Sequence, residues 1–293
     1  MRFIRFKWFY FLISAIVILP GVFSLLKWGL RPSIDFTGGT ILELEFAQDG
    51  ASDLQAVKET LDQLKIEYSS VQPSGDKRVL IKAQPITRED VSSIIGTVAE
   101  KAGEKPTELR FDTVGPTLGK ELIKKTILGV ILASGFILAY VWKQFKEPMY
   151  GVCAILAMFH DSLVLLGIFS LLGHFAGVEI DTLFVTAVLT ILSFSVHDTV
   201  VVYDRIRESR KKFSGVPFQD LADKAITETL SRSINNSMTI IIMLMVLYLL
   251  GGSTIKWFVF ALLVGTVSGT YSSTFTAVPL LVVWNEIKNR KKK

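Results

Sequence analysis

The sequence predicts an α-helical polytopic membrane protein with six transmembrane helices and a small α+β domain outside the membrane. Half of the 293 residues are apolar and the mean hydropathy is +0.44. These apolar residues are gathered into six long blocks, and the polar segment 30–120 separates the first two. The one cysteine, Cys153, lies in an apolar block, which excludes an internal disulfide and argues against a metal–thiolate site.

Each apolar block is long enough to cross a bilayer, which takes about 20 residues of helix. The first block is expected to be a membrane anchor rather than a signal peptide, because no small-residue cleavage pattern follows its long apolar region. The predicted spans are about 8–28, 122–142, 149–172, 182–204, 234–251 and 257–284. They divide the chain into a first helix (1–29), the outer segment (30–120) and five further helices (121–293).

Lysine and arginine residues beside the spans predict the orientation, because these residues resist translocation. The loop 173–181 has neither, and the loop 251–257 has only Lys256. We therefore expect both termini in the cytoplasm and segment 30–120 on the opposite side. The basic segments are the N-terminus, the loop around 143–146, the inner loop 205–232 and the tail 288–293. Because the net charge of +5 is concentrated beside the spans, it argues against a nucleic-acid partner.

The segment 30–120 alternates between strand-like and helix-like patterns. In chain order we expect a strand at 40–46, a helix at 52–64, strands at 68–72 and 78–82 around a turn at 73–77, a helix at 87–101 and a strand at 108–113. The order β-α-β-β-α-β predicts a ferredoxin-like domain. The segment has no nucleophile and base arrangement, which favours a binding or mechanical module.

The inner loop 205–232 contains an amphipathic pattern at 217–230. Pro217 is compatible with a helix start, and apolar residues recur at helical spacing after it. We expect a helix here, which either lies on the inner membrane surface or packs under the bundle.

The fourth span carries Asp198, the most informative residue of the chain. An ionisable side chain at membrane depth is energetically expensive, so a functional site is the default interpretation. Surroundings that alternate between burial and a nearby cation would allow the carboxyl group to bind and release a proton. The alternative is a structural polar contact between helices.

Other polar residues of the spans are weaker candidates. His160 and Asp161 fall in the middle of the third span, where they could form a relay or a satisfied structural pair. Asp204 and Arg205 lie near the cytoplasmic exit of the fourth span. Asp204 follows Asp198 by six residues and therefore lies on a different helix face, while topology anchoring explains Arg205.

Three motifs resemble the SecF family, the smaller subunits of the SecD/SecF accessory complex of the bacterial protein-export translocase, within the resistance-nodulation-division superfamily. They are Ile34-Asp35-Phe-Thr-Gly38-Gly39-Thr, Ser195-Val-His197-Asp198-Thr-Val-Val-Val-Tyr-Asp204-Arg205-Ile-Arg-Glu and Thr229-Leu-Ser-Arg232-Ser-Ile-Asn-Asn. The resemblance covers essentially the whole chain. Many family members carry Asn where this chain has His197, a departure that concerns the local hydrogen bonding.

The resemblance implies a proton-driven transport component rather than an enzyme, with no cofactor beyond the proton as coupling ion. It implies that Asp198 takes up the proton and that Arg232 modulates Asp198. It also implies that Asp161 belongs to a His-Asp element of the family. Without the resemblance, the preferred interpretation of Arg232 is a topology anchor, whose long side chain extends to the membrane surface on the cytoplasmic side. Gly38 and Gly39 are expected to allow a tight turn, with a structural or conformational role.

The implied function is to work with SecD, using the proton motive force to promote late steps of protein export across the bacterial cytoplasmic membrane. The implied partners are SecD, the SecY/SecE/SecG channel with its associated factors, an unfolded preprotein and the lipid bilayer. Two alternatives stay open: half of a small-molecule or lipid exporter of the same superfamily, and a non-transporting assembly scaffold. An intramembrane protease is disfavoured because the spans lack paired catalytic aspartates and a His-Glu-x-x-His element.

Overall fold

The computed structural model describes residues 2–47, 54–74, 77–145, 147–213 and 215–290. The chain divides into two compact units. One, the membrane unit, comprises residues up to 31 and from 128 onward, and the other, the α+β unit, comprises residues 32–127. The second boundary therefore falls inside a long helix that begins at Pro116.

Among the described residues, six helical stretches are long and apolar enough to cross a bilayer, which confirms the predicted number of spans. They are α1 (Lys7–Lys27, preceded by a 3-10 turn at Ile4–Phe6), α5 (Pro116–Gln144), α6 (Pro148–Ala176), α7 (Thr182–Lys212), α8 (Phe218–Leu250) and a last stretch formed by α9 (Lys256–Ser272), a π-helix (Ser273–Ala277) and α10 (Val278–Arg290). Several extend past the apolar runs into polar sequence, as α7 does beyond 204 and α8 does before 234. At the start of α7, the Phe184 amide donates to Asp181 Oδ1 at 2.7 Å.

The amphipathic segment 217–230 is not a separate helix on the membrane surface. It is the first part of α8, which runs without a break. Its apolar face is buried in the core cluster that also contains Tyr203 and Ile206 of α7. Ile4 contributes to the same cluster, and its amide donates to Asp223 Oδ1 at 2.9 Å. The packing alternative is therefore the one observed, because apolar side chains of neighbouring helices cover this face.

Small residues bring α1 and α6 into close contact. A Cβ built on Gly167 would lie only 2.6 Å from the Cα of Gly21. On the same two helices, the buried hydroxyl oxygens of Ser24 and Ser170 lie 2.7 Å apart. In a membrane, where burial from water does not drive helices together, this close approach supplies the packing and hydrogen-bonding energy.

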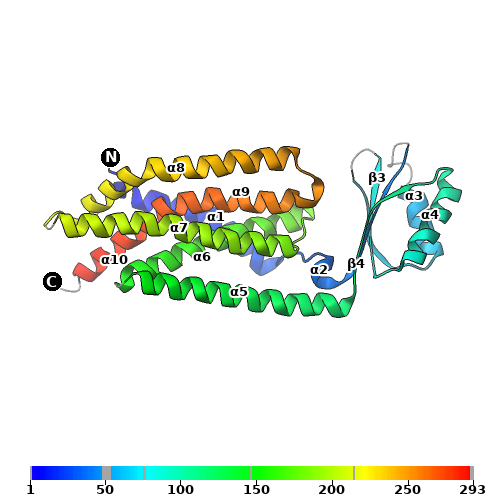
Figure 1. Ribbon diagram of the computed structural model, residues 1–293, viewed down its shortest axis with the longest axis horizontal. Helices are drawn as coiled ribbons and strands as arrows, with labels where there is room; N and C mark the ends of the chain where they lie inside the picture. The colour runs from blue at the N-terminus through cyan, green and yellow to red at the C-terminus, as the bar shows by residue number, and fades with distance from the viewer. Residues whose placement is uncertain (1, 48–53, 75–76, 146, 214, 291–293) are drawn as a thin grey trace. The chain divides into compact units, whose positions relative to one another are not determined.

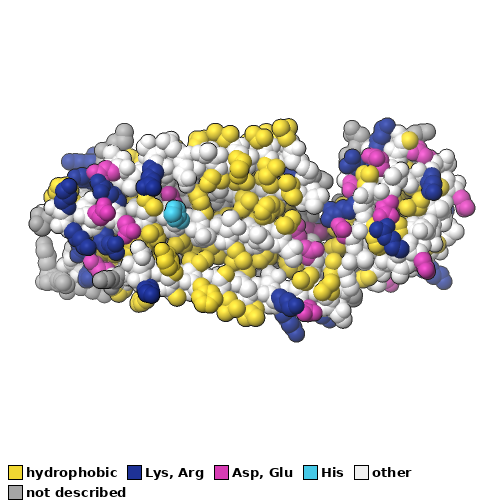
Figure 2. Space-filling view, viewed as in Figure 1, with side chains coloured by type: hydrophobic (Ala, Val, Ile, Leu, Met, Phe, Trp, Pro, Cys, Tyr) yellow, Lys and Arg dark blue, Asp and Glu magenta, His cyan; other side chains and the backbone are white. Residues whose placement is uncertain are grey.

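Both termini lie at the same end of the helical bundle (Figure 1), as an even number of spans requires. Charged side chains gather over this end, whereas the middle of the visible bundle face is largely apolar (Figure 2). Ion pairs join the helices there: Lys7 lies 2.5 Å from Glu286, and Arg210 lies 2.9 Å from Glu147.

The span α5 is covered least by the rest of the chain. Between residues 120 and 144, Val141 alone is buried. Beyond the charged residues near its two ends, many exposed side chains are large and apolar, among them Ile131, Phe136 and Trp142. This surface suits lipid or another subunit and not water.

The α+β unit has the predicted order of elements. They are β1 (Gly39–Glu45), α3 (Leu54–Gln63), β2 (Tyr68–Pro73), β3 (Arg78–Ala83), α4 (Arg88–Ala102) and β4 (Thr107–Val114), with a one-turn helix α2 (Ile34–Thr37) before β1. The strands form an antiparallel sheet in the order β2-β3-β1-β4, and α3 and α4 cover one of its faces (Figure 1). This is the ferredoxin-like arrangement.

Alternation along the strands and helical spacing on α3 and α4 explain the core of this unit. Leu42, Leu44 and Ile81 of the sheet are wholly buried with Leu61 and Ile94 of the helices. The predicted Thr-Arg-Glu-Asp cap is present at α4, where the Thr87 hydroxyl and the Asp90 carboxylate bond to each other's backbone amides. The predicted start of the first helix, at 52, and part of the turn at 73–77 lie outside the described residues.

The contact between Gly21 and Gly167 yields a prediction. Gly167→Ala places a methyl group against the α1 backbone, so the helices must separate, at a cost of about 1–3 kcal/mol. We expect a lower Tm of the detergent-solubilised protein, measured by fluorescence-detected size-exclusion chromatography after heating. The matched control is Gly129→Ala on α5, where an added Cβ meets nothing within 4 Å. An equal loss in both variants would contradict close α1–α6 packing as the cause.

Candidate functional site

Asp198 lies in the interior of the bundle, on α7, and is 8% exposed. Two serine hydroxyls donate to its Oδ2 atom: Ser233 of α8 at 2.6 Å and Ser273, the first residue of the π-helix, at 2.5 Å. In the described part of the chain, no lysine or arginine pairs with this carboxylate. The site thus holds a carboxyl group among neutral partners.

Serine hydroxyls suit a carboxyl group that changes its protonation state. A hydroxyl carries one donor and two acceptor lone pairs, and its hydrogen can rotate. Ser233 and Ser273 can therefore donate to an ionised Asp198, and one of them can accept from the same group when it is protonated. A lysine or arginine partner, which only donates, would hold the carboxylate ionised.

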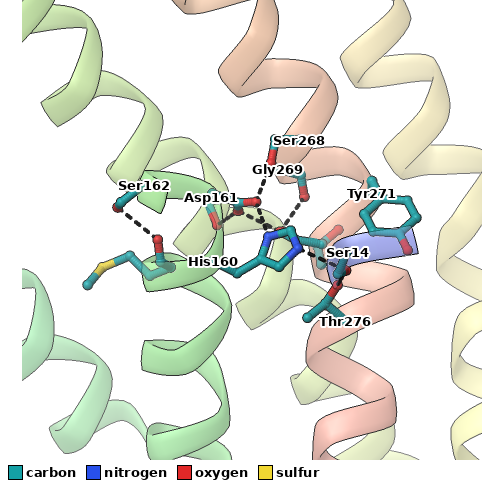
Figure 3. A network of polar contacts seen from close by, with 12 residues as sticks. Ser14, His160, Asp161, Ser162, Ser268, Gly269, Tyr271 and Thr276 are labelled. Atoms are coloured by element: carbon teal, nitrogen blue, oxygen red, sulfur yellow. Dashed lines mark hydrogen bonds and ion pairs between the residues drawn. The ribbon is translucent and has the colours of Figure 1, made fainter. Parts of the chain in front are cut away.

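Asp161 of α6 is a second buried carboxylate and is wholly inaccessible. Its partners are shown in Figure 3. Ser195 and Ser272 donate to Oδ2 at 2.6 and 2.5 Å, and Ser268 donates to Oδ1 at 2.6 Å. His160 Nδ1 lies 3.0 Å from Oδ1. Three helices, α6, α7 and α9, therefore meet at this one carboxylate.

His160 extends the Asp161 cluster to the first span. Its Nε2 atom lies 2.9 Å from the Ser14 hydroxyl of α1, which in turn lies 3.3 Å from the Thr276 hydroxyl of the π-helix. Tyr271 lies alongside the imidazole, with ring centroids 6.4 Å apart, and Figure 3 shows it next to Ser14. The structure thus joins His160 and Asp161 within a larger network of polar contacts.

The π-helix Ser273–Ala277 contributes to both carboxylate sites. π-helical turns are rare and occur mostly at functional sites. The wider turn departs from the regular hydrogen bonding of an α-helix, and Tyr203 of α7, fully buried, donates its hydroxyl to the Ala277 carbonyl at 2.7 Å. Side chains of α1 and α7 thus hold this segment in place.

The sequence analysis identifies the two carboxylates as candidates, but it does not identify the serines that donate hydrogen bonds to them. Five serines on three helices and the π-helix donate to Asp161 and Asp198: Ser195, Ser233, Ser268, Ser272 and Ser273. The available signal is in the last span, where seven of the eleven residues at 266–276 are Ser or Thr. A hydroxyl-rich stretch inside an apolar block indicates a surface that is hydrogen-bonded within the protein.

Arg232 and His197 are not brought into contact with Asp198 by the structure. Both side chains are exposed, and within the described ranges no hydrogen bond or ion pair joins either of them to that carboxylate. It is Ser233, the residue after Arg232, that makes the contact.

Exposed polar residues at membrane depth form one face on each of α7 and α8. We call them together the polar face. Its members, spaced by three or four residues on α7 and similarly on α8, are Thr186, Thr190, Ser193 and His197, and Arg232, Asn235, Asn236 and Thr239. The three threonines donate to carbonyl groups of their own helices. Polar groups are costly against hydrocarbon, so the charged, imidazole and amide side chains of this face favour a protein neighbour or water.

Asp204 and Arg205 lie toward the C-terminal end of α7, apart from the two carboxylate sites. Asp204 pairs with Arg207 at 3.0 Å. Arg205 bridges Glu228 of α8 at 2.5 Å and Glu208 at 2.9 Å. These residues tie helix ends together at the bundle end that holds both termini.

The Asp35, Gly38 and Gly39 motif connects α2 to β1 in the α+β unit. Asp35 is in the first turn of α2. Gly38 and Gly39 have φ angles of +75° and +137°, which other residues rarely adopt. A Cβ on Gly39 would also lie 2.9 Å from the Ala83 carbonyl oxygen of β3. The motif therefore has the tight turn predicted for it.

An apolar pocket of about 410 Å³ lies beside His160, between α1, α6 and α9. Its walls include Ile13, Val164 and Leu263, with Ser14 and His160 among the lining residues. No group of three or more His, Cys, Asp and Glu side chains in the described ranges is arranged to hold a metal ion.

Ionisable groups kept at membrane depth are typical of membrane transport proteins, and a membrane transport component is the class that the fold and the carboxylate sites indicate. The models of two families match the chain: "Protein export membrane protein SecD/SecF, C-terminal" over residues 94–287 and "SecD/SecF GG Motif" over residues 23–49.

Relatives match over nearly the full length. A "Protein translocase subunit SecF" from Thermobaculum terrenum is 42% identical, over 96% of this chain and 93% of its own. A protein of the same name from Anaerolinea thermophila is 39% identical, over 95% and 92%. The crystal structure of SecDF, a translocon-associated membrane protein from Thermus thermophilus, superimposes with a TM-score of 0.84 at 30% identity, over 98% of this chain and 39% of that one. The chain belongs to the SecF family of protein translocase subunits.

The glycine turn yields a prediction for the α+β unit. Gly39→Ala forces a strained φ and a clash with β3, which we expect to cost about 1–3 kcal/mol. The amides of β1 and β3 should then exchange faster by at least fivefold in hydrogen exchange followed by mass spectrometry of the full chain. Gly96→Ala, at an exposed position of α4 with open space around the Cβ, is the control and should be neutral or stabilising. Unchanged exchange in Gly39→Ala would contradict the constraint.

Proposed function

We propose that this chain, paired with a SecD partner, is an accessory subunit of the Sec translocase that uses the proton motive force to promote late steps of protein export. The observation that carries the proposal is Asp198, a buried carboxyl group in a span with serine hydroxyls as hydrogen-bond partners. Near-complete similarity to proteins named as translocase subunits supports the export role.

The proposed coupling ion is the proton, and Asp198 is its binding group. One proton moving across a potential of 100 mV supplies about 2.3 kcal/mol, before any pH gradient is added. This free energy changes a two-state equilibrium by more than tenfold. It is enough to bias the bundle and the α+β unit between two conformations, of which one holds an emerging polypeptide and hinders its return.

A partner half is needed to cover the polar face of α7 and α8. Arg232 and His197 belong to this face, and lipid cannot satisfy their hydrogen bonding. The chain corresponds to about 39% of the length of SecDF, which leaves room in that protein for another half. In the proposed assembly the SecD half packs on the polar face, and Arg232 modulates the proton site from the interface between the halves.

The proposed location is the bacterial cytoplasmic membrane, with both termini in the cytoplasm. Basic residues concentrate at the bundle end that contains the termini (Figure 2), and such residues resist translocation. The α+β unit then acts on the outer side, where an unfolded preprotein emerges from the SecY/SecE/SecG channel.

The exporter alternative has one observation in its favour, the apolar pocket beside His160. A lipid or an apolar small molecule would suit its lining. The translocase role is preferred because the relatives that match nearly the whole chain carry that name.

The proposal predicts the effect of Asp198→Asn, a substitution of nearly equal shape that cannot exchange a proton. In inverted membrane vesicles containing this chain with its SecD partner, preprotein translocation should lose at least nine tenths of the increment that a proton gradient produces. Translocation without the gradient should be unchanged. The measurement is protease protection of a radiolabelled preprotein, with and without the gradient.

The matched control is Asp220→Asn, an exposed carboxylate at the start of α8, which should retain the increment. Co-purification of the SecD partner verifies assembly of both variants. A full increment in the assembled Asp198→Asn complex would leave Asp198 with a structural role and refute the proton-binding step.

A further inference from the structure

The two buried carboxylates are attached to neighbouring residues of one segment. Ser272, the last residue of α9, donates to Asp161 at 2.5 Å, and Ser273, the first residue of the π-helix, donates to Asp198 at 2.5 Å. Both serines are wholly buried. Since side chains one residue apart on a helix point about 100° apart, the pair reaches two different helices, α6 and α7, from one place in the chain.

We infer that Ser272 and Ser273 are positioning residues that couple the two carboxylates, so that proton uptake at Asp198 is transmitted to Asp161 and from there to α1. The inference rests on the proposed proton binding at Asp198. Its first step is a loss of charge: a neutral carboxyl group is a weaker acceptor for the Ser273 hydroxyl than a carboxylate is.

The π-helix is the element that can respond to this change. Its backbone hydrogen bonds span five residues instead of the four of an α-helix. Such a wide turn persists where the surrounding side chains fix its position. Three contacts from other helices hold it: Asp198 accepts from Ser273, Tyr203 donates to the Ala277 carbonyl, and Ser14 meets Thr276. Weakening the first allows the π-helical turn to shift along the chain, which rotates the residues that it passes.

Ser272 converts such a rotation into a change at Asp161. It lies directly before the π-helix, so a shift of the wide turn toward α9 moves the Ser272 hydroxyl away from Asp161. Ser268 donates to the same carboxylate from one turn earlier in the regular part of α9, and its contact is not expected to move. The two serines therefore form a natural pair of test and control residues.

The route continues from Asp161 to α1 through the side chain of His160, which is within hydrogen-bonding distance of both helices' polar groups. His160 lies between Asp161 and Ser14 at 3.0 and 2.9 Å. The helix α1 is joined by the short segment 28–33 to α2 and the glycine turn of the α+β unit. A change in α1 is thus passed along the covalent chain toward that unit.

The titratable groups around this route are few. On the helices packed against α7 they are Tyr150, Cys153, His160 and Asp161 of α6, Arg232 of α8 and Tyr271 of α9. On α7 itself, His197 precedes Asp198, and Tyr203 follows it and donates to the Ala277 carbonyl. Asp161 and His160 form the route, and Arg232 and His197 are exposed. In the test, Asp198→Asn replaces a pH change, so that none of the other groups titrates.

The experiment uses a fluorine label on α1 in the full chain assembled with its SecD partner in lipid nanodiscs. Cys153→Ala removes the single native cysteine, and Ile16→Cys, at an exposed α1 position, accepts a trifluoroethyl label. The ¹⁹F chemical shift is compared with and without Asp198→Asn. The same comparison with the label at Ile131→Cys, exposed on α5, reports any unspecific change.

We expect Asp198→Asn to move the resonance of the α1 label and to leave the α5 label unchanged. In the Ser272→Ala/Ser273→Ala background the α1 change should fall at least fivefold, and in the Ser268→Ala background it should persist. If the double variant does not assemble, Ser272→Ala alone serves, because it breaks the link to Asp161 and leaves Ser273 on Asp198. An α1 change that survives loss of these serines, or no α1 change at all, overturns the inference.

The proposed function and this inference can fail separately. In one outcome, Asp198→Asn leaves gradient-driven translocation intact but moves the α1 resonance, and this movement is lost when the serines are replaced. The proton-driven function then fails and the conformational link stands. In the other outcome, gradient-driven translocation depends on Asp198, and Asp198→Asn moves the α1 resonance equally with and without the serines. The function then stands and the coupling through Ser272 and Ser273 is wrong.

Discussion

A carboxyl group inside a membrane must find its hydrogen-bond partners within the protein, because hydrocarbon offers none. The bundle satisfies this need twice, at Asp161 and at Asp198, and both times with serines from neighbouring helices. The requirement explains why α6, α7, α8 and the last span meet where they do. It also accounts for the hydroxyl-rich stretch in a span that would otherwise be apolar.

The serine hydroxyls around the two carboxylates affect the dynamics of the bundle as well as its stability. A serine can donate to a carboxylate or accept from a carboxylic acid by rotating its hydrogen, so both protonation states of Asp198 are compatible with the same backbone. The π-helix next to these serines adds a segment with more than one accessible hydrogen-bonding register. In the proposed mechanism, a proton bound at Asp198 weakens the Ser273 contact while the serine hydroxyls keep hydrogen-bond partners inside the protein.

Close packing and tight turns supply the rest of the framework. The glycine contact between α1 and α6 brings Ser24 and Ser170 within 2.7 Å and runs along the same two helices that carry Ser14 and His160. At the other end of α1, positive φ angles at Gly38 and Gly39 allow the chain to enter the sheet. The first span therefore takes part in the polar network by its side chains, and residues 28–33 join it to the first element of the α+β unit.

The sequence by itself determined the six spans and the order of the ferredoxin-like unit, and it identified Asp198 as a candidate site residue. Hydrophobic blocks, strand and helix periodicity and a charge at membrane depth are local signals. Only the tertiary structure decided which side chains surround the carboxylates, since Asp161 meets serines 34 to 111 residues away in the chain. It also placed Ser233 rather than Arg232 beside Asp198, merged segment 217–230 into α8 and introduced the π-helix. Such contacts depend on how helices rotate and cross, and that is set by packing between spans and not by the pattern within any one of them.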